Sequence, residues 1–286
     1  MRRVHPWETR RVGRVINDTD RLPATEQGVA EGMSRRDRGL RVGCAGWAIP
    51  SQHAHAFPSQ GTHLERYAQR FTGVEVNSSF YRPHRPTTYA RWAASVPDQC
   101  QFAVKMPKEI THTRHLVEVT APLERFLTEV QSLGAKLGPL LLQLPPSLRF
   151  TEPLVQTFLT ALRTRFHGPV VCEPRHQSWC SPAAAQLLRA FQVARVAADP
   201  ARAPAAAVPG GWPGLVYYRW HGTPEMYMSA YTTAAVEALA ARVAPAARTV
   251  PTWCIFDNTA RGAATMNALE LLARQAAAPA TPSHAG

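Results

Sequence analysis

Charged and amide side chains alternate with branched apolar residues in one short stretch of the sequence. Glu75 and Asn77 are separated by Val76, and Val74 precedes them. Because successive side chains of a β-strand point to opposite faces, the carboxylate and the amide share one face and the two valines share the other. The pattern predicts a strand that lines a polar interior. Tyr81 follows this strand and is a candidate for contact with a ligand.

Polar or aromatic residues recur at the ends of the other predicted strands. They are Trp47, Lys105, Gln143, Glu173, Arg175, Asp199, Arg219, His221, Asp257 and Asn258. His112 and His176 lie in loops that follow two of these strands. Charged groups gathered in one place are unfavourable unless they pair with opposite charges or bind a ligand. The repeated pattern therefore predicts a functional site at the strand ends.

Glu75 and Glu173 are the candidates for acid/base catalysis, and as carboxylates they are also candidate metal ligands. The structural alternative pairs Glu173 with Arg175 and Glu75 with Lys105. Lys105 is assigned to anchoring a phosphate or carboxylate or to neutralising a nearby carboxylate, and a Schiff-base nucleophile is its less favoured role. His221 completes the catalytic candidates, because the glycine after it lets the backbone approach a ligand closely.

The other polar residues are assigned to substrate binding. They are Trp47, Asn77, Tyr81, His112, Gln143, Arg175, His176, Asp199, Arg219 and Asn258. Structural alternatives stand beside these roles, since Asp199 would cap a turn, His112 and His176 would lie on the surface, and amides would satisfy interior hydrogen bonds. We predict no cofactor, and a divalent metal is the less favoured alternative, because no HExxH motif is present. A GxSxG elbow is also absent, which argues against serine-hydrolase chemistry.

Strand and helix patterns alternate eight times along the chain. Predicted strands cover 41–47, 73–77, 102–107, 139–146, 170–175, 194–199, 215–222 and 252–258. Predicted helices follow them at 61–71, 86–95, 120–137, 152–166, from 181 onward, 232–243 and 260–275. Such alternation predicts parallel strands joined by right-handed crossovers. Eight units over about 235 residues predict a single-domain (β/α)8 TIM barrel, with an irregular connection after strand six. A doubly wound open sheet is the alternative, but no GxGxxG turn follows the first strand.

Composition limits the class of protein. The chain has 286 residues, of which 45% are apolar, and no apolar run of about 18 residues predicts a membrane span. Residues 1–39 are predicted to be a disordered or loosely attached basic extension, 40–275 the barrel domain and 276–286 a disordered tail. Met33 is a second candidate for the first residue. Five widely spaced cysteines indicate reduced thiols in a cytoplasmic protein.

The formal net charge is +12, yet only three of the 32 basic residues are lysines, namely Lys105, Lys108 and Lys136. A nucleic-acid partner is one interpretation of this charge. The arginines are scattered and form no dense basic run, so a solvated surface is the favoured interpretation. A lysine that persists in so arginine-rich a chain is notable, and Lys105 is one.

Several sequence blocks resemble those of one known family. They are VGCAGW at 42–47, VEVNSSFY at 74–81, FAVK at 102–105, QLPP at 143–146, EPRH at 173–176 and YRWHG at 218–222. On these blocks the chain is identified as a member of the YecE-like family, a domain of unknown function (DUF72). The resemblance implies a TIM barrel and supplies no reaction. The chain departs from the family pattern at Asp257, which stands where the family has an asparagine, and at Cys44 and Ala45, which replace small hydroxyl residues.

These observations predict an enzyme of the hydrolase, lyase or isomerase type that acts on a small polar or anionic molecule, such as a phosphorylated or sugar-like compound. Two alternatives remain at this stage. One is a nucleic-acid-acting barrel of endonuclease-like architecture that holds phosphates on its basic surface. The other is a barrel that binds a ligand without catalysis. No membrane partner is predicted, and no feature of the sequence indicates an oligomeric state.

Overall fold

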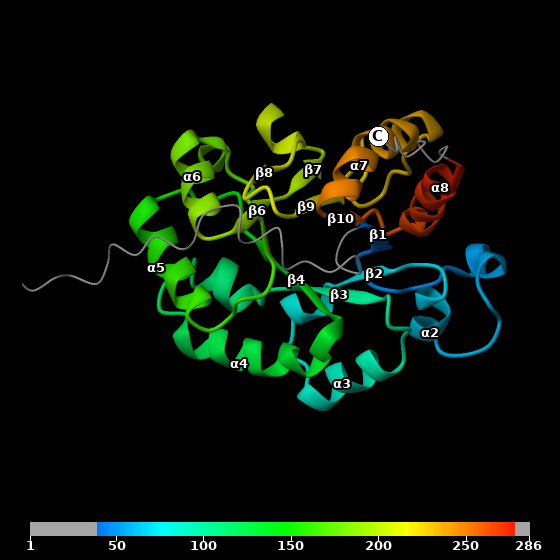
Figure 1. The fold of residues 1–286 in the computed structure, drawn as a ribbon, viewed down its shortest axis with the longest axis horizontal. Coiled ribbons are helices and arrows are strands. Elements are labelled where there is room, and N and C mark those ends of the chain that lie inside the picture. The colour runs from blue at the N-terminus through cyan, green and yellow to red at the C-terminus, as the bar shows by residue number, and fades with distance from the viewer. Residues whose placement is uncertain (1–38, 278–286) are drawn as a thin grey trace, which may run out of the picture. The chain divides into compact units, whose positions relative to one another are not determined.

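The computed structural model describes residues 39–277 (Figure 1). The predicted extension before Gly39, Met33 included, and the predicted tail after Ala277 lie outside the described residues. No helix in the described part of the chain combines the length and the apolar character needed to cross a membrane.

The strands of the described residues form two sheets, and the fold is a single mixed α/β domain. The first sheet has the order β1 (Gly39–Cys44), β10 (Pro251–Phe256), β9 (Val216–Trp220) and β7 (Ala197–Asp199). The second has the order β2 (Gly73–Val76), β3 (Gln101–Lys105), β4 (Leu137–Gln143), β5 (Val170–Glu173), β6 (Val193–Arg195) and β8 (Gly210–Gly211). All pairings are parallel except that of β6 with β8. The predicted alternation of parallel strands and helices is thereby confirmed.

The two sheets approach each other at two places. Ala45, which follows β1, forms an isolated parallel bridge with Glu75 in β2, and the Gly46 N–H donates to the Glu75 carbonyl at 2.8 Å. At the other place one chain segment serves both sheets, because β6 and β7 are separated only by Val196. The Val196 N–H donates to Cys172 in β5 at 2.9 Å. The described strands nevertheless form two sheets rather than one closed sheet.

Helices follow most of the strands, as the sequence pattern requires. They are α2 (His63–Ala68), α3 (Pro86–Ala94), α4 (Thr120–Val130), α5 (Glu152–Arg163), α6 (Pro182–Ala190), α7 (Thr233–Thr249) and α8 (Ala263–Ala277). Short helical turns are η1 (Ser51–Ala56), η2 (Ser78–Phe80), η3 (Glu109–Thr113), η4 (Gln131–Lys136), η5 (Gln177–Cys180) and η6 (Pro204–Ala207). Figure 1 shows α7 and α8 beside β1 and β10, against which they pack.

Several predicted helices differ in length from the observed ones, and two of these differences involve a glycine or a proline. The helix predicted at 120–137 ends at Val130, because Gly134 takes a φ of 56° that no helix contains, and η4 carries the chain to β4. The helix predicted to end at Val243 continues to Thr249 and includes Pro245, a residue that normally ends a helix. The connection after strand six is irregular, as predicted, and holds only η6 and the two-residue β8.

An apolar cluster and the polar strand ends share the same face of the strands. The cluster includes Ala103, Leu141, Val171, Tyr217, Trp253 and Ile255, which come from both sheets. Two residues further along the same strands stand Lys105, Gln143, Glu173, Arg219 and, after Ile255, Asp257. Because side chains of a strand repeat with a period of two, each strand passes from an apolar to a polar contact on one face. The apolar cluster therefore lies next to the polar site, two residues earlier along the same strands.

Gly43 is required where β1 approaches β2. A Cβ atom at this position would lie 1.8 Å from the Gly73 carbonyl oxygen and 2.7 Å from the Tyr67 hydroxyl. Neither the backbone nor the buried Tyr67 ring can move away cheaply. Overpacking a core usually costs about 1–3 kcal/mol, and Gly43→Ala is expected to lower the free energy of unfolding by about 3 kcal/mol or more. Urea unfolding measures the loss.

Gly210→Ala is the matched control for this prediction, because the three atoms nearest to its new Cβ all belong to the guanidinium end of Arg195. A flexible side-chain end moves more easily than a backbone carbonyl, so the control should lose less stability. Equal losses in the two variants would contradict the requirement for close approach at Gly43.

Candidate functional site

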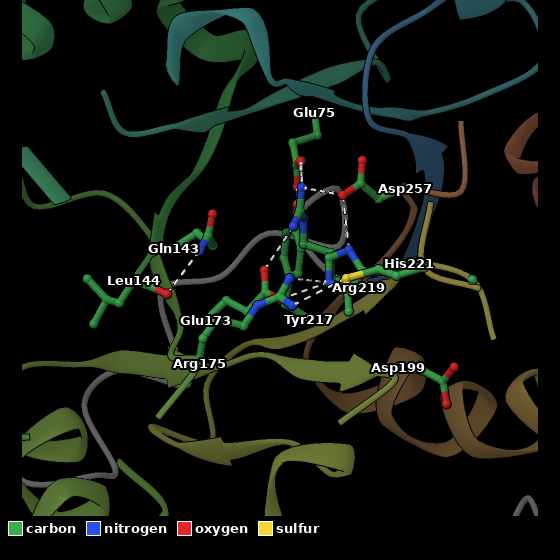
Figure 2. Close-up of polar contacts among 12 residues, drawn as sticks. Glu75, Gln143, Leu144, Glu173, Arg175, Asp199, Tyr217, Arg219, His221 and Asp257 are labelled. Carbon is green, nitrogen blue, oxygen red and sulfur yellow. Dashed lines mark hydrogen bonds and ion pairs between the residues drawn. The ribbon is translucent and has the colours of Figure 1, made fainter. Parts of the chain in front are cut away.

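Arg219 lies at the centre of a buried cluster of charged side chains at the strand ends (Figure 2). Its Nε and Nη2 donate to the two carboxylate oxygens of Glu75 at 3.0 and 2.7 Å. Its Nη1 donates to Glu173 Oε2 at 2.9 Å, and Nη2 lies 3.0 Å from Asp257 Oδ2. A guanidinium has five N–H donors in a fixed planar fork, and these contacts use most of them. Arg219 therefore binds and orients three carboxylates rather than a ligand.

His221 connects two of the same carboxylates. Its Nδ1 lies 3.0 Å from Asp257 Oδ2, and its Nε2 lies 2.8 Å from Glu173 Oε1. The same Nε2 is 2.9 Å from Arg175 Nη2, which is itself 2.7 Å from Glu173 Oε1. A ring with a proton on both nitrogens donates to both carboxylates, and a neutral ring accepts from Arg175 at Nε2. His221 Nε2 thus has both a carboxylate and a guanidinium within hydrogen-bond distance.

The cluster holds two of its carboxylates, Glu173 and Asp257, in the charged form. Burial alone would raise the pKa of Glu173, but His221, Arg219 and Arg175 together hold it well below its usual range. Burial opposes ionisation of Asp257 too, and Arg219 and His221 nonetheless lower its pKa. These two side chains are therefore weak proton acceptors at neutral pH.

Lys105 belongs to this site but is not paired within it. The residue is only 6% exposed, and no ion pair or hydrogen bond engages Nζ among the residues that the structure describes. The ammonium instead faces the Phe80 ring, with Nζ 4.1 Å from the ring centroid. Burial, aided by Arg219, lowers the pKa of Lys105 to about 8, against the opposing effect of Glu75. The alternative pairing of Glu75 with Lys105 is wrong, since Glu75 pairs with Arg219, whereas Glu173 does pair with Arg175.

Only part of the cluster can meet a ligand. Lys105, Arg175 and Asp257 keep residue exposures of 6%, 8% and 4%. The enclosed members, each at most 1% exposed, are Glu75, Glu173, Arg219 and His221. Arg175 also has free donor capacity, because its Nε lacks a partner and its Nη1 contacts only the Met226 sulfur at 3.9 Å. The members that retain some exposure are thus two cations and one carboxylate.

Several predicted binding residues have structural partners outside the cluster. Asp199 accepts from Thr223 and Tyr231 at 2.6 and 2.8 Å, and so holds the loop after β9. His176 accepts from the Ser178 N–H at 3.1 Å and caps η5. Gln143 donates to the Leu144 carbonyl at 2.9 Å. In Figure 2 the Gln143 and Asp199 side chains have no drawn contact with the charged residues.

The remaining candidates also lie around the cluster rather than within it. Trp47 packs edge-on against Trp92 in α3, and Tyr81 is 75% exposed. Asn258 donates to Asn267 in α8 and to a backbone carbonyl, so it fixes the start of that helix. They also include Asn77, whose buried Oδ1 has no partner, and His112, which contacts the Phe80 ring and whose pKa is lowered to about 4 by burial and by Lys105.

Two residues of the cluster, Tyr217 and Asp257, have no catalytic or binding role assigned from the sequence. Tyr217 donates to Glu75 Oε2 at 3.0 Å, and burial together with Glu75 raises the pKa of its phenol well above the usual range. Asp257 contacts both Arg219 and His221. The period of two along β9 would have found Tyr217, because it precedes Arg219 and His221 on one face. Asp257 stands at a predicted strand end, but the family has an asparagine at this position, so the family pattern assigns it no role.

A protein metal site requires several ligating side chains close together. An HxH spacing does occur at His53 and His55 in η1. Within residues 39–277, no three or more His, Cys, Asp or Glu side chains are grouped so that they could hold a metal ion. The carboxylates at the strand ends are instead bound by arginine and histidine side chains.

Comparison with known proteins assigns the chain to a family. The family described as "Protein of unknown function DUF72" matches residues 41–285. The chain belongs to the DUF72 family. The resemblance to YecE-like proteins is thereby confirmed. The match begins at Arg41 within β1 and includes all the later strands.

Two curated relatives of this DUF72 protein carry the name UPF0759. YecE of Escherichia coli K12 is 34% identical over 116 residues, which are 40% of this chain and 42% of YecE. YunF of Bacillus subtilis 168 is 26% identical over 152 residues, which are 50% of this chain and 53% of YunF. The chain thus spans about half the length of the curated relatives that it matches.

Solved structures of DUF72 proteins share the fold. A DUF72 family protein of Enterococcus faecalis has a TM-score of 0.69 at 21% identity, covering 83% of this chain and 95% of its own. One from Thermotoga maritima has a TM-score of 0.68 at 23% identity, covering 82% of this chain and 98% of its own. At these identities the likeness concerns the fold.

Proposed function

We propose that this DUF72 protein is an enzyme that acts on a small anionic molecule at the carboxyl ends of its strands. The observation that carries the proposal is the buried ammonium of Lys105, which has no ion pair or hydrogen bond among the described residues although three carboxylates influence it. A desolvated charge without a partner is unfavourable in a resting fold. A bound anion would supply that partner.

Lys105 is also the group best suited to acid/base chemistry near neutral pH. A pKa of about 8 leaves both its charged and its neutral form populated, which is what general acid/base catalysis needs. Glu75 is fully enclosed and bound by Arg219, and the pKa of Glu173 is too low for efficient proton uptake. We therefore assign proton transfer to Lys105, anion binding to Lys105 and Arg175 together, and positioning of the surrounding carboxylates to Arg219.

The two sheets are best interpreted as parts of a (β/α)8 barrel. This part of the proposal is supported by the bridge between Ala45 and Glu75 and by the segment that passes from β6 to β7 through Val196. Between these places the order of the strands follows the sequence around the ring, with β8 as an antiparallel addition. In such barrels the site of reaction lies at the carboxyl ends of the strands.

A ligand screen on three forms of the protein tests the proposed function. Small phosphorylated and carboxylated compounds are added to the wild type, Lys105→Met and Lys108→Met, with melting temperature and turnover as the measurements. We expect at least one anionic compound to stabilise the wild type and the exposed-lysine control but not Lys105→Met, and its turnover to fall by about 100-fold or more in that variant. A screen in which Lys105→Met binds and turns over the same compounds as the wild type would overturn the proposal.

A further inference from the structure

Lys105 has the surroundings of a nucleophile rather than of a permanent counter-ion. A counter-ion is held against its carboxylates, whereas Lys105 Nζ faces an aromatic ring and forms no ion pair within the described residues. Fully buried polar atoms without a partner include Asn77 Oδ1 and Arg175 Nε but not Lys105 Nζ. The amine end therefore keeps a small contact with solvent, through which a reactant can approach it.

The choice of amino acid points the same way. The chain has only three lysines among 32 basic residues, so an anion anchor would be expected to be arginine like nearly every other cation. An arginine retains its proton and is a poor nucleophile, whereas a desolvated lysine can attack a carbonyl carbon. Arg175 pairs with Glu173, one of the carboxylates that also act on Lys105, and its Nη1 contacts only the Met226 sulfur, so it would already provide the permanent charge for an anion.

We propose that Lys105 forms an imine with a small aldehyde or ketone whose anionic group is bound by Arg175. The inference rests on the proposed function and names its substrate class as anionic carbonyl compounds. The neutral amine adds to the carbonyl carbon, the carbonyl oxygen becomes the hydroxyl of a carbinolamine, and loss of that hydroxyl as water leaves the C=N bond. The two hydrogens of the water come from the amine, and no oxidant or reductant is consumed.

Reductive trapping tests the imine directly. Wild-type protein is incubated with glyoxylate and sodium cyanoborohydride at pH 7.5, and peptide mapping by mass spectrometry follows the adduct on each amine with time. With a pKa of about 8, Lys105 has on the order of 100-fold more free amine at this pH than an ordinary lysine of pKa about 10.4. We expect its adduct to form at least about 10-fold faster than that of the exposed Lys108.

Three controls belong to the same experiment. Lys136 is a second comparison, because its Nζ donates to the Ala93 carbonyl at 2.8 Å and is not free to react. The α-amino group of the chain reports that the reagent is active. Lys105→Arg keeps the charge and should lose only the Lys105 adduct, and Arg175→Gln should slow trapping of glyoxylate but not of uncharged propanal.

The outcomes separate the imine from the proposed function. Labelling of Lys105 no faster than Lys108 overturns the imine. If anionic compounds still raise the melting temperature of the wild type but not of Arg175→Gln, the anion site then stands without it. Fast labelling with glyoxylate and propanal alike, and no dependence on Arg175, overturns the anionic substrate class while leaving Lys105 as a reactive amine.

Discussion

Replacing Arg219 by glutamine is expected to lower the free energy of unfolding by about 3–5 kcal/mol, because removing one partner of a buried ion pair leaves uncompensated charge behind. Arg219 is 1% exposed and contacts Glu75, Glu173 and Asp257 at 2.7–3.0 Å. At about 2–4 °C per kcal/mol for a domain of this size, the melting temperature should fall by roughly 10 °C. Urea unfolding followed by circular dichroism gives the free energy.

Arg165→Gln is the control for this prediction. Arg165 pairs with Glu124 at 2.9 Å on the exposed surface, where an ion pair contributes about 0–1 kcal/mol. Arg219→Lys retains the charge but loses the bidentate contact with Glu75, and it provides a measurable variant if Arg219→Gln does not fold. Similar losses for Arg219→Gln and Arg165→Gln would show that the buried cluster is not held together by Arg219.

Lys105→Met is expected to act in the opposite direction and to raise the free energy of unfolding by about 1–3 kcal/mol at pH 7. Folding lowers the pKa of Lys105 from 10.5 to about 8, so the charged form is less favourable in the folded than in the unfolded chain. Each pKa unit corresponds to about 1.4 kcal/mol. Methionine has a similar length and no charge to desolvate, so it removes this cost.

The effect has a defined pH dependence. Between about pH 8 and 10.5 the unfolded chain holds a proton on Lys105 that the folded protein has released, so wild-type stability rises with pH in this window. Below about pH 8 both the folded and the unfolded chain hold this proton, so the destabilising effect of the buried charge is present in full. The advantage of Lys105→Met should therefore shrink as the pH rises from 7 to 10, while exposed Lys108→Met changes little at either pH. A variant less stable than the wild type at pH 7 would show that Lys105 is a stabilising counter-ion.

Gain of stability on loss of a functional group is the expected signature of a site that is strained by its task. The two predictions thus divide the cluster into distinct parts. Arg219 stabilises the fold and positions carboxylates. On the second prediction Lys105 destabilises the fold, which the chemistry proposed for its amine would explain. A purely structural charge network would lose stability at both positions.

Much of the fold could be predicted because its signals are local. The period of two in 74–77 and the stripe of Leu123, Phe126, Leu127 and Val130 in α4 depend on neighbouring residues only. Errors arose where one residue overrides a pattern. Gly134 takes a positive φ and ends the helical path, and Pro245 is accommodated inside α7. The division of the strand at Val196 between two sheets depends on partners far away in the chain.

The site was predicted as a set of strand ends but not as a network of contacts. The positions of Glu75, Glu173, Arg219 and His221 on inward faces follow from strand alternation. Which cation meets which carboxylate does not follow, since Arg219 reaches Glu75 across 144 positions of sequence and displaces Lys105 as its partner. The unpaired state of Lys105 is likewise visible only once the competing arginine has been placed.

The ion pairs of Arg219 also bear on how the chain folds while it is being synthesised. Glu75 and Glu173 leave the ribosome well before Arg219, which follows them by 144 and 46 residues. Until β9 has been made, a nascent chain that tried to close around these carboxylates would bury them without their main cation. We therefore expect the amino-terminal strands to reach their final packing only after β9 has been synthesised.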